Sequence, residues 1–343
     1  PHRAAVPRAG HHEHLQAIHV PSDQVLWDCS MLDPCALRLV RNRTTQRDAT
    51  TGSHGGSAMS RTQTSRDERR RTLSQNFLVT PRSISRFLDA AELERDDEVV
   101  EVGAGSGALT GLLADRCARL VAYEVDRSWS SKLEAEVARR TNIEIVYEDF
   151  LSAVLPTGPI KVVGNIPFGA TSAIVDRVLS LEAVRSATFI TQLEYAKKRT
   201  GAYGRWSRLT ATTWPEHEWE LRGRIPRTDF RPVPRVDAGV LHLRRRDSPL
   251  IETGRMRAYT AMVELAFSGV GGSVRASLSK KYPSALVRES LGAAGVPADA
   301  VVAYVSPDQW VTVFRSLVGT TSATSANAAK HRRRPQPSRR KTR

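Results

Sequence analysis

Between residues 98 and 246, short apolar runs alternate with segments of helical periodicity. Apolar runs of strand length occur at 98–103, 119–126, 143–149, 161–165, 186–192 and 238–246. Helical spacing occurs between them at 108–117, at 128–140 and from about 171 onward. The runs are apolar almost throughout, which is typical of strands that are buried on both faces of a parallel sheet. We therefore predict an α/β fold in which helices cover both faces of a mostly parallel sheet.

Composition divides the chain into four segments. Residues 1–58 scatter His, Pro, Ser and Thr without a period, and we expect a disordered extension, with the functional protein starting at Met59. Residues 59–246 carry the α/β pattern. The apolar spacing becomes helical over 247–320, which predicts a small helical domain. Residues 321–343 are rich first in Ala, Ser and Thr and then in Arg, which is typical of a disordered tail.

The charge balance favours a polyanionic partner. The chain carries 51 Lys and Arg against 36 Asp and Glu, a formal net charge of +15. Eight of the basic residues lie between 330 and 343, a stretch without acids. Nucleic acid is the first candidate and an anionic membrane surface the second, while a solvated basic surface is the plainer interpretation.

Several protein classes are disfavoured by what the sequence lacks. It has no run of eighteen apolar residues and no secretory signal pattern at its start. Its three cysteines are odd in number and unevenly placed, which argues against a disulfide framework or a four-cysteine zinc site. The histidines at 11, 12 and 14 lie in a low-complexity stretch, where such clusters are usually incidental. We therefore expect a cytoplasmic protein without a membrane span or a metal ion.

Three glycines, Gly103, Gly105 and Gly107, follow the first strand directly. Glycine allows a tight turn and the close approach of a ligand, although a tight strand–helix connection needs no ligand. The spacing is G-x-G-x-G rather than the G-x-G-x-x-G of dinucleotide-binding proteins, and no G-K-[ST] follows. The turn therefore suits a nucleoside without a pyrophosphate, and a nicotinamide dinucleotide is the second choice.

Acidic residues follow the next two strands. Glu124 ends the second apolar run, where a carboxylate can accept hydrogen bonds from ribose hydroxyls. Asp149 ends the third and is placed to meet the exocyclic amine of an adenine. Each acid alone has a simpler reading as a solvated strand end. Together with the glycine turn, they resemble the class I S-adenosylmethionine-dependent methyltransferases, which implies a Rossmann-like, mostly parallel seven-stranded sheet.

The fourth strand ends in an unusual tetrad, Asn165, Ile166, Pro167 and Phe168. The amide oxygen of Asn165 and the backbone carbonyl of Ile166 can accept both hydrogens of an adenine amine, which makes its nitrogen a better nucleophile. Pro167 keeps Ile166 extended, and Phe168 can stack on the base. Taken singly, Asn is an ordinary turn residue, Pro an ordinary loop residue and Phe an ordinary core residue. Together they predict methyl transfer to an amino group.

At this point the chain resembles the ribosomal RNA adenine N6-dimethyltransferases, and among them the Erm macrolide-resistance enzymes. The resemblance spans about residues 60–317. The matching segments are SQNFL (74–78), EVGAGSGALT (101–110), YEVD (123–126), EDFL (148–151), NIPFGATSAIV (165–175), RTGAYGRWSRLT (199–210), FRPVPRVDAGVL (230–241) and GVGGSVRASL (269–278).

This resemblance implies specific roles. It places residues of the first matching segment, namely Gln75, Asn76 and Leu78, over S-adenosylmethionine, and Gly103 against the methionine portion. It assigns the ribose to Glu124, the cofactor's adenine to Asp149, and the target base to Asn165 and Phe168, with Asn165 also touching the cofactor. The implied target is one adenine in the peptidyl-transferase loop of 23S rRNA, whose dimethylation blocks macrolide, lincosamide and streptogramin B binding.

Basic residues with interleaved aromatics predict where RNA binds. One group lies between predicted elements and comprises Arg199, Arg205, Trp206 and Arg208, although Trp206 is as readily explained as a core residue. The other group lies in the tail, where phosphates would be bound without reading sequence, and comprises Arg332, Arg333, Arg334, Arg339, Arg340 and Lys341.

Three alternatives remain at this point. A housekeeping small-subunit rRNA dimethyltransferase would share the sheet but more often has Asn-Leu-Pro-Tyr at the fourth strand. A non-catalytic RNA-binding relative would keep the fold, and a DNA or small-molecule amino-methyltransferase would not need the basic tail. We expect a monomer in which the helical domain over 247–320 takes part in RNA recognition. The sequence leaves open whether one or two methyl groups are added.

Overall fold

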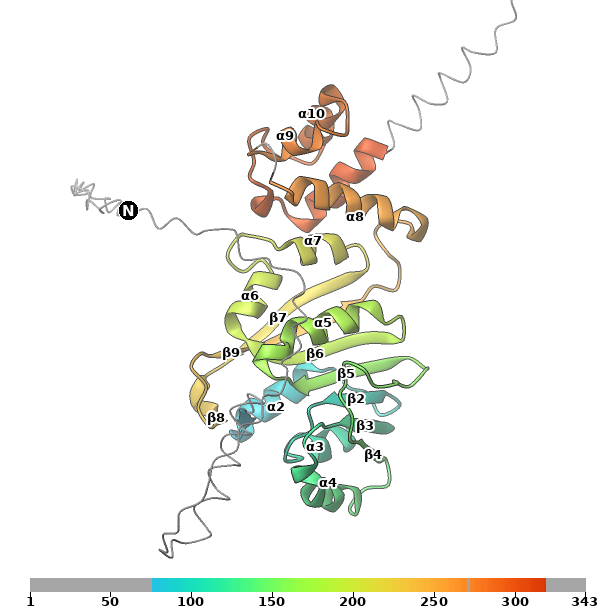
Figure 1. Cartoon of the computed structure of the whole chain (residues 1–343), viewed down its shortest axis with the longest axis vertical. Helices are drawn as coiled ribbons and strands as arrows, with labels where there is room; N and C mark the ends of the chain where they lie inside the picture. The colour runs from blue at the N-terminus through green and yellow to red at the C-terminus, as the bar shows by residue number, and fades with distance from the viewer. Residues whose placement is uncertain (1–75, 270–271, 319–343) are drawn as a thin grey trace, which may run out of the picture. The chain divides into compact units, whose positions relative to one another are not determined.

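A computed structural model describes residues 76–269 and 272–318 (Figure 1). The expectations for 1–58, for Gln75 and for 321–343, including the six basic tail residues, lie outside these ranges. Within them, no helix is both long enough and apolar enough to cross a lipid bilayer.

A seven-stranded sheet forms the centre of the described chain, in the order β4-β3-β2-β5-β6-β9-β7. Its strands are β2 (Glu98–Val102), β3 (Arg119–Tyr123), β4 (Ile143–Val146), β5 (Ile160–Asn165), β6 (Val184–Gln192), β7 (His217–Ile225) and β9 (Ala238–Arg245). The first five strands in this order are parallel, and β9 runs antiparallel to both β6 and β7. The predicted mostly parallel, seven-stranded sheet is confirmed.

The strands and helices differ from their predicted bounds. β3 and β4 end at Tyr123 and Val146, so that Glu124 and Asp149 lie in the loops after them. β7 was not predicted, because it is an edge strand in which charged residues face solvent and no apolar run marks it. The helices predicted at 108–117 and 128–140 are shorter in the structure, where α3 spans Thr110–Ala114 and α4 spans Ser130–Val137.

Helices cover both faces of the sheet because successive strand residues point to opposite sides. On one side Val99 and Val163 pack with Phe87 of α2 (Pro81–Ala90) and with α3. On the other side Val100 and Val162 pack with α5 (Thr171–Ser180) and α6 (Leu193–Arg199). Both layers are buried, which explains why these strands read as continuous apolar runs.

A two-stranded sheet carries the first described residues. β1 (Phe77–Leu78) pairs antiparallel with β8 (Phe230–Arg231). Leu78 and Phe230 are both buried in the core that α2 covers. This pairing holds Asn76 and Phe77 beside the carboxyl ends of the main strands.

The helices after β9 surround a hydrophobic core that includes Tyr259 and Trp310. They are α8 (Thr253–Phe267), α9 (Val274–Leu278), α10 (Ser284–Ala293), the short 3-10 helix η4 (Val302–Tyr304) and a helix over 307–318. Ala211 of α7 (Arg208–Thr213) belongs to the same core, and its carbonyl accepts a hydrogen bond from the Tyr259 hydroxyl at 2.8 Å. The helical segment is therefore anchored to α7.

Candidate functional site

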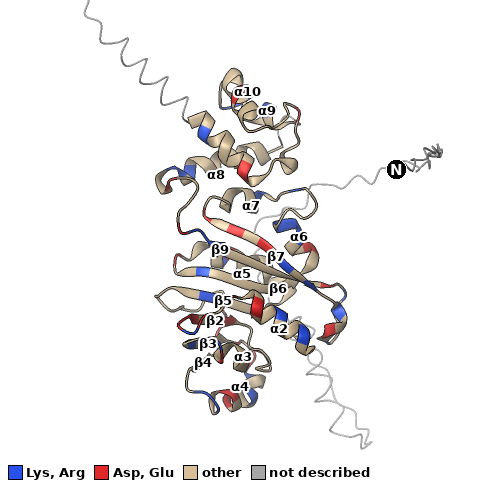
Figure 2. Ribbon diagram, turned by 180° about the vertical axis from the view of Figure 1, so that it is seen from behind, with Lys and Arg blue, Asp and Glu red and all other residues tan. Residues whose placement is uncertain are grey.

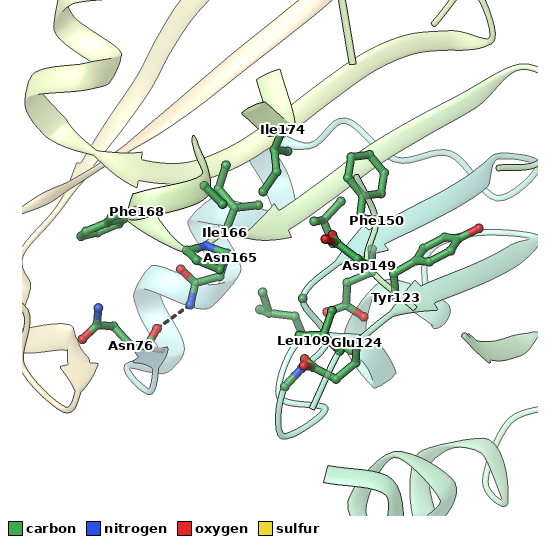
Figure 3. Close-up of a pocket in the computed structure, with 18 of the residues that line it drawn as sticks. Asn76, Leu109, Tyr123, Glu124, Asp149, Phe150, Asn165, Ile166, Phe168 and Ile174 are labelled. Carbon is green, nitrogen blue, oxygen red and sulfur yellow. Dashed lines mark hydrogen bonds between the residues drawn. The ribbon is translucent and has the colours of Figure 1, made fainter. Parts of the chain in front are cut away.

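A cavity of about 380 Å³ lies where the parallel strands β2, β3 and β5 end, which is where open α/β sheets bind their ligands. Most of the residues predicted for the site line it: Asn76, Leu78, Gly103, Gly105, Glu124, Asp149, Asn165, Ile166, Pro167 and Phe168. Figure 3 shows Asn165 and Phe168 on one side of this cavity and Glu124 and Asp149 on the other. The structure thus gathers residues from four strand ends and from the N-terminal segment.

The glycine turn after β2 has left-handed backbone conformations. Gly105 has φ +52° and its N–H donates to Glu124 Oε2 at 2.7 Å. A Cβ at Gly105 would lie 2.8 Å from the Phe77 ring, so the close approach requires glycine here. Gly107 does not line the cavity, because it faces α4, where a Cβ would meet Glu136 Cγ at 3.3 Å.

Glu124 is buried, with 3 % of its surface exposed. Its Oε1 accepts from the N–H of Asp126 at 2.8 Å, and its Oε2 accepts from Gly105. Burial raises the pKa of this carboxyl, and the two backbone hydrogen bonds oppose that shift. The carboxylate is therefore fixed in place while each oxygen keeps capacity for a further hydrogen bond.

Asp149 is exposed and lies in the loop after β4. Its Oδ1 accepts from the N–H of Leu151 at 2.9 Å, which shapes the turn. Arg177 of α5 holds the same loop, because its guanidinium donates to the carbonyls of Leu151 and Ala153 and lies 5.5 Å from the centre of the Phe150 ring. No sequence pattern predicts this role of Arg177, because it depends on two segments that meet only in the fold.

The tetrad after β5 has a defined internal arrangement. The side-chain amide of Asn165 donates from Nδ2 to the backbone carbonyl of Asn76 at 2.7 Å, drawn as the dashed line in Figure 3. This bond leaves Asn165 Oδ1 as the atom with free acceptor capacity. Ile166 is buried, Pro167 is extended with φ −58° and ψ 129°, and Phe168 is half-buried at the cavity wall.

Two further lining residues, Phe77 and Glu101, were missed from the sequence. The Phe77 ring packs edge-on against Trp129 with centroids 5.2 Å apart. Glu101 is 1 % exposed, and its Oε2 has no hydrogen-bond partner within the described residues. Burial raises the pKa of Glu101 to about 7, and the neighbouring charge of Glu124 adds to the effect. An acid inside the apolar run of β2 was the signal that could have identified it.

Replacing Glu101 by glutamine is expected to change how stability depends on pH. The folded-state pKa of about 7 lies above the ordinary 4.5, so the folded protein keeps a proton that the unfolded chain has lost between these values. Stability from this group is therefore lost as pH rises through that window. The unfolding free energy of Glu101→Gln relative to that of wild type should therefore be roughly 2–3 kcal/mol higher at about pH 8 than at about pH 5.

The measurement is urea unfolding of both proteins at the two pH values. Taking the difference in unfolding free energy between variant and wild type cancels the contributions of other titrating groups. Among these groups are the buried His217 and His242, whose pKa values burial lowers to about 4. Glu134→Gln on the exposed face of α4 is the matched control and should show a change within about 0.5 kcal/mol. A pH-independent difference for Glu101→Gln would contradict a buried, titrating carboxyl.

The residues predicted to bind RNA divide into two kinds. Arg199 is half-buried, donates to Ser207 Oγ at 3.0 Å and lies over the Tyr195 ring. Trp206 is also half-buried and packs edge-on against Trp214, with ring centroids 5.9 Å apart. Arg205 and Arg208, in contrast, are exposed.

Metal ligands do not cluster in the parts of the chain that the structure describes. Within 76–269 and 272–318, no three His, Cys, Asp or Glu side chains are grouped as a metal site would require.

Comparisons with known proteins agree with this geometry. The model of the family "Ribosomal RNA adenine dimethylase" matches residues 66–318. An rRNA methyltransferase from Streptomyces thermotolerans is 49 % identical over 253 residues, covering 74 % of this chain and 85 % of the relative. An rRNA adenine N-6-methyltransferase from Saccharopolyspora erythraea is 48 % identical over 254 residues, covering 74 % and 67 %.

A solved structure is similar over the same region. The crystal structure of the 23S rRNA methyltransferase ErmE is 48 % identical, covers 71 % of this chain and 100 % of its own, and superposes with a TM-score of 0.69. The matched region contains the seven-stranded sheet, the cavity and the tetrad after β5. This chain belongs to the ribosomal RNA adenine dimethylase family.

Proposed function

We propose that this protein transfers methyl groups from S-adenosylmethionine to the exocyclic N6 of one adenine in the peptidyl-transferase loop of 23S rRNA, and that it adds two. The observation that carries the proposal is the shared cavity: Asn165 and Phe168 face the same space as Gly103, Glu124 and Asp149. A nucleoside donor and an adenine acceptor therefore fit side by side.

The residues present fit S-adenosylmethionine. Glu124 offers two immobilised oxygens to ribose hydroxyls, and Asp149 offers a carboxylate for the adenine amine. Phe150, held by Arg177, supplies an apolar wall for the base. The buried Glu101 Oε2 without a partner within the described residues suits a cationic donor. When bound, S-adenosylmethionine supplies a methyl group on a sulfonium, which needs no Lewis acid for activation.

The chain's own contribution to the reaction is positioning. Asn76 holds the Asn165 amide so that Oδ1 is the atom that accepts one hydrogen of the target amine. The backbone carbonyl of Ile166, kept extended by Pro167, accepts the other. With both hydrogens engaged in the first transfer, the nitrogen lone pair is less delocalised into the ring and is aimed at the methyl group. Each methyl gained replaces one N6 proton, which is released to solvent, so in the second transfer one of the two acceptors holds the single remaining hydrogen. Phe168 stacks on the base, which must leave its helix to enter the cavity.

The proposal extends to the substrate RNA, the cellular location and the oligomeric state of the protein. Ribosomal RNA is the substrate, so the protein acts in the cytoplasm, and we propose that it does so as a monomer without a metal ion. The helical segment over 247–320 contributes to RNA recognition. Dimethylation at this position would confer resistance to macrolides, lincosamides and streptogramin B.

The test is incorporation of labelled methyl groups into transcripts of 23S and 16S rRNA. We expect incorporation into naked 23S rRNA and little into 16S rRNA. Incorporation into 16S rRNA alone would identify a small-subunit enzyme, and none into either would identify a non-catalytic RNA-binding relative. A DNA oligonucleotide that is methylated as well as 23S rRNA would indicate a DNA amino-methyltransferase.

A further inference from the structure

Two segments that are almost one hundred residues apart meet beside α6. The N–H of Trp206 donates to the carbonyl of Ala303 at 2.7 Å. Arg205 Nε donates to the Tyr304 hydroxyl at 3.0 Å, and the guanidinium carbon lies 5.3 Å from the centre of the Tyr304 ring. The loop between α6 and α7 is thereby joined to η4 of the helical segment.

The aromatic rings at this junction are exposed. Tyr304 is 53 % exposed and Tyr203, in the same loop as Arg205, is 47 % exposed. Among the exposed large apolar side chains of the described residues, these two are the only aromatic ones. A cation–aromatic contact at such an exposed surface adds little to the stability of the fold. Folding therefore does not explain why rings, rather than small polar residues, stand here.

Positive charge surrounds the rings. Lys197 Nζ lies 5.1 Å from the centre of the Tyr203 ring, and Lys198 and Arg208 are exposed nearby in sequence. The ribbon of α6 is blue in Figure 2 where its basic residues lie, and its one acid, Glu194, is in the first turn. Arg205 uses only Nε in its hydrogen bond to Tyr304, and within the described residues its two terminal nitrogens make none. They are available to a phosphate.

The junction connects to the edge of the sheet that holds the tetrad. Asn165 of β5 is in register with Ile190 of β6, and α6 begins directly after β6 ends. The Tyr203 hydroxyl bonds to Glu194, in the first turn of α6. Tyr203 therefore reaches back toward the strand ends, while Tyr304 lies on the side of the helical segment. Figure 1 shows α6 leading from that edge toward α7.

We propose that Tyr203, Arg205 and Tyr304, here called the tyrosine platform, bind unpaired nucleotides of the RNA near the target adenine. One base stacks on the exposed ring of Tyr304, a neighbouring base stacks on that of Tyr203, and Arg205 binds an adjoining phosphate through its terminal nitrogens. This inference rests on the proposed function, because it names where the same RNA is gripped. Ring stacking accepts any base, so the platform contributes affinity and register rather than sequence reading.

The test measures binding of a fluorescent hairpin transcript from the peptidyl-transferase region of 23S rRNA by anisotropy. Loss of a stacked base corresponds to about 5- to 150-fold weaker binding, so we expect Tyr304→Ala to weaken binding by about tenfold or more. Tyr304→Phe keeps the ring and should bind within about twofold of wild type. Arg205→Gln should weaken binding and lower the salt slope by about one.

The matched control is Val301→Ala, which shortens an apolar side chain that is 51 % exposed beside η4 and carries no ring. It should bind RNA as wild type does. S-adenosylmethionine affinity should be unchanged in all variants, and thermal unfolding reports whether they are folded.

Tyr304→Ala and Arg205→Gln that both bind the hairpin as tightly as wild type would overturn the platform. Equal losses in Tyr304→Phe and Tyr304→Ala would overturn stacking as well, because the phenylalanine ring stacks equally. The proposed function fails separately, when the wild-type protein does not methylate 23S rRNA. If the wild-type protein methylates 23S rRNA and Tyr304→Ala has an unchanged KM for the RNA, the platform is rejected and the proposed function stands.

Discussion

Replacing Asn165 by alanine is expected to lower kcat for methyl transfer by about 10²–10³-fold, the usual effect of removing one hydrogen-bonding group that acts on the transition state. In the proposed reaction Asn165 Oδ1 accepts a hydrogen bond from the target amine, and its orientation depends on the bond from Nδ2 to the Asn76 carbonyl. Because Glu124, Asp149 and the glycine turn are untouched, affinity for S-adenosylmethionine should change much less than kcat.

Two further variants separate chemistry from folding. Asn165→Asp keeps an acceptor oxygen but places a carboxylate against the Asn76 carbonyl, so we expect a rate between those of wild type and Asn165→Ala. Asn142→Ala is the control, since Asn142 also donates to backbone carbonyls, those of Ala114 and Cys117, but lies outside the cavity lining. It should keep its kcat. Retention of more than about one tenth of the wild-type kcat by Asn165→Ala would contradict the assigned role.

Replacing Glu124 by alanine is expected to weaken S-adenosylmethionine binding by about 100-fold or more. The carboxylate holds the N–H groups of Gly105 and Asp126, and charge-assisted bonds of this kind contribute about 1.5–3 kcal/mol each. Without it, the glycine turn loses its support and the ribose loses its acceptor. Glu124→Gln retains one acceptor oxygen but sets an NH₂ group against a backbone N–H, so we expect an intermediate loss.

Isothermal titration calorimetry of S-adenosylmethionine measures this effect directly. Glu144→Ala is the control, because it removes an acid from β4 that pairs with Arg119 and does not line the cavity. It should bind the cofactor as wild type does. A dissociation constant for Glu124→Ala within about threefold of wild type would show that Glu124 is not a cofactor ligand.

The fold was predictable from sequence to the extent that its information is local. Continuous apolar runs identified β2, β3 and β5, because both faces of these strands are buried. The parallel arrangement then brought the glycine turn, Glu124 and Asp149 to one edge. β7 was not predicted, because an edge strand with a solvated face has no continuous apolar run.

The parts of the site that sequence did not predict depend on contacts between distant segments. The bond between Asn165 and Asn76 joins residues 89 positions apart. Burial raises the pKa of Glu101, and an acidic residue in a sequence is ordinarily expected to be exposed. Pairing of Arg205 with Tyr304 spans 99 positions. A spacing pattern along one segment has no information about such partners.

The proposed RNA-binding surface was also predicted only in part. The segment around Arg205 was marked by its basic and aromatic residues, but their composition did not tell which side chains point outward. In the structure Trp206 is half-buried against Trp214, whereas Arg205 is exposed. Tyr203, which lies in the matching segment 199–210 but was given no role, and Tyr304, which lies outside every matching segment, are the exposed tyrosines of the described residues.

The central claim is that one adenine of 23S rRNA receives two methyl groups at N6. Reverse transcription across the peptidyl-transferase loop, after incubation of the transcript with protein and S-adenosylmethionine, tests it most directly. Two methyl groups abolish Watson–Crick pairing, so we predict a strong stop at a single adenine, which is absent without cofactor and greatly reduced with Asn165→Ala. Measurable methyl incorporation into 23S rRNA without any stop would contradict dimethylation at N6.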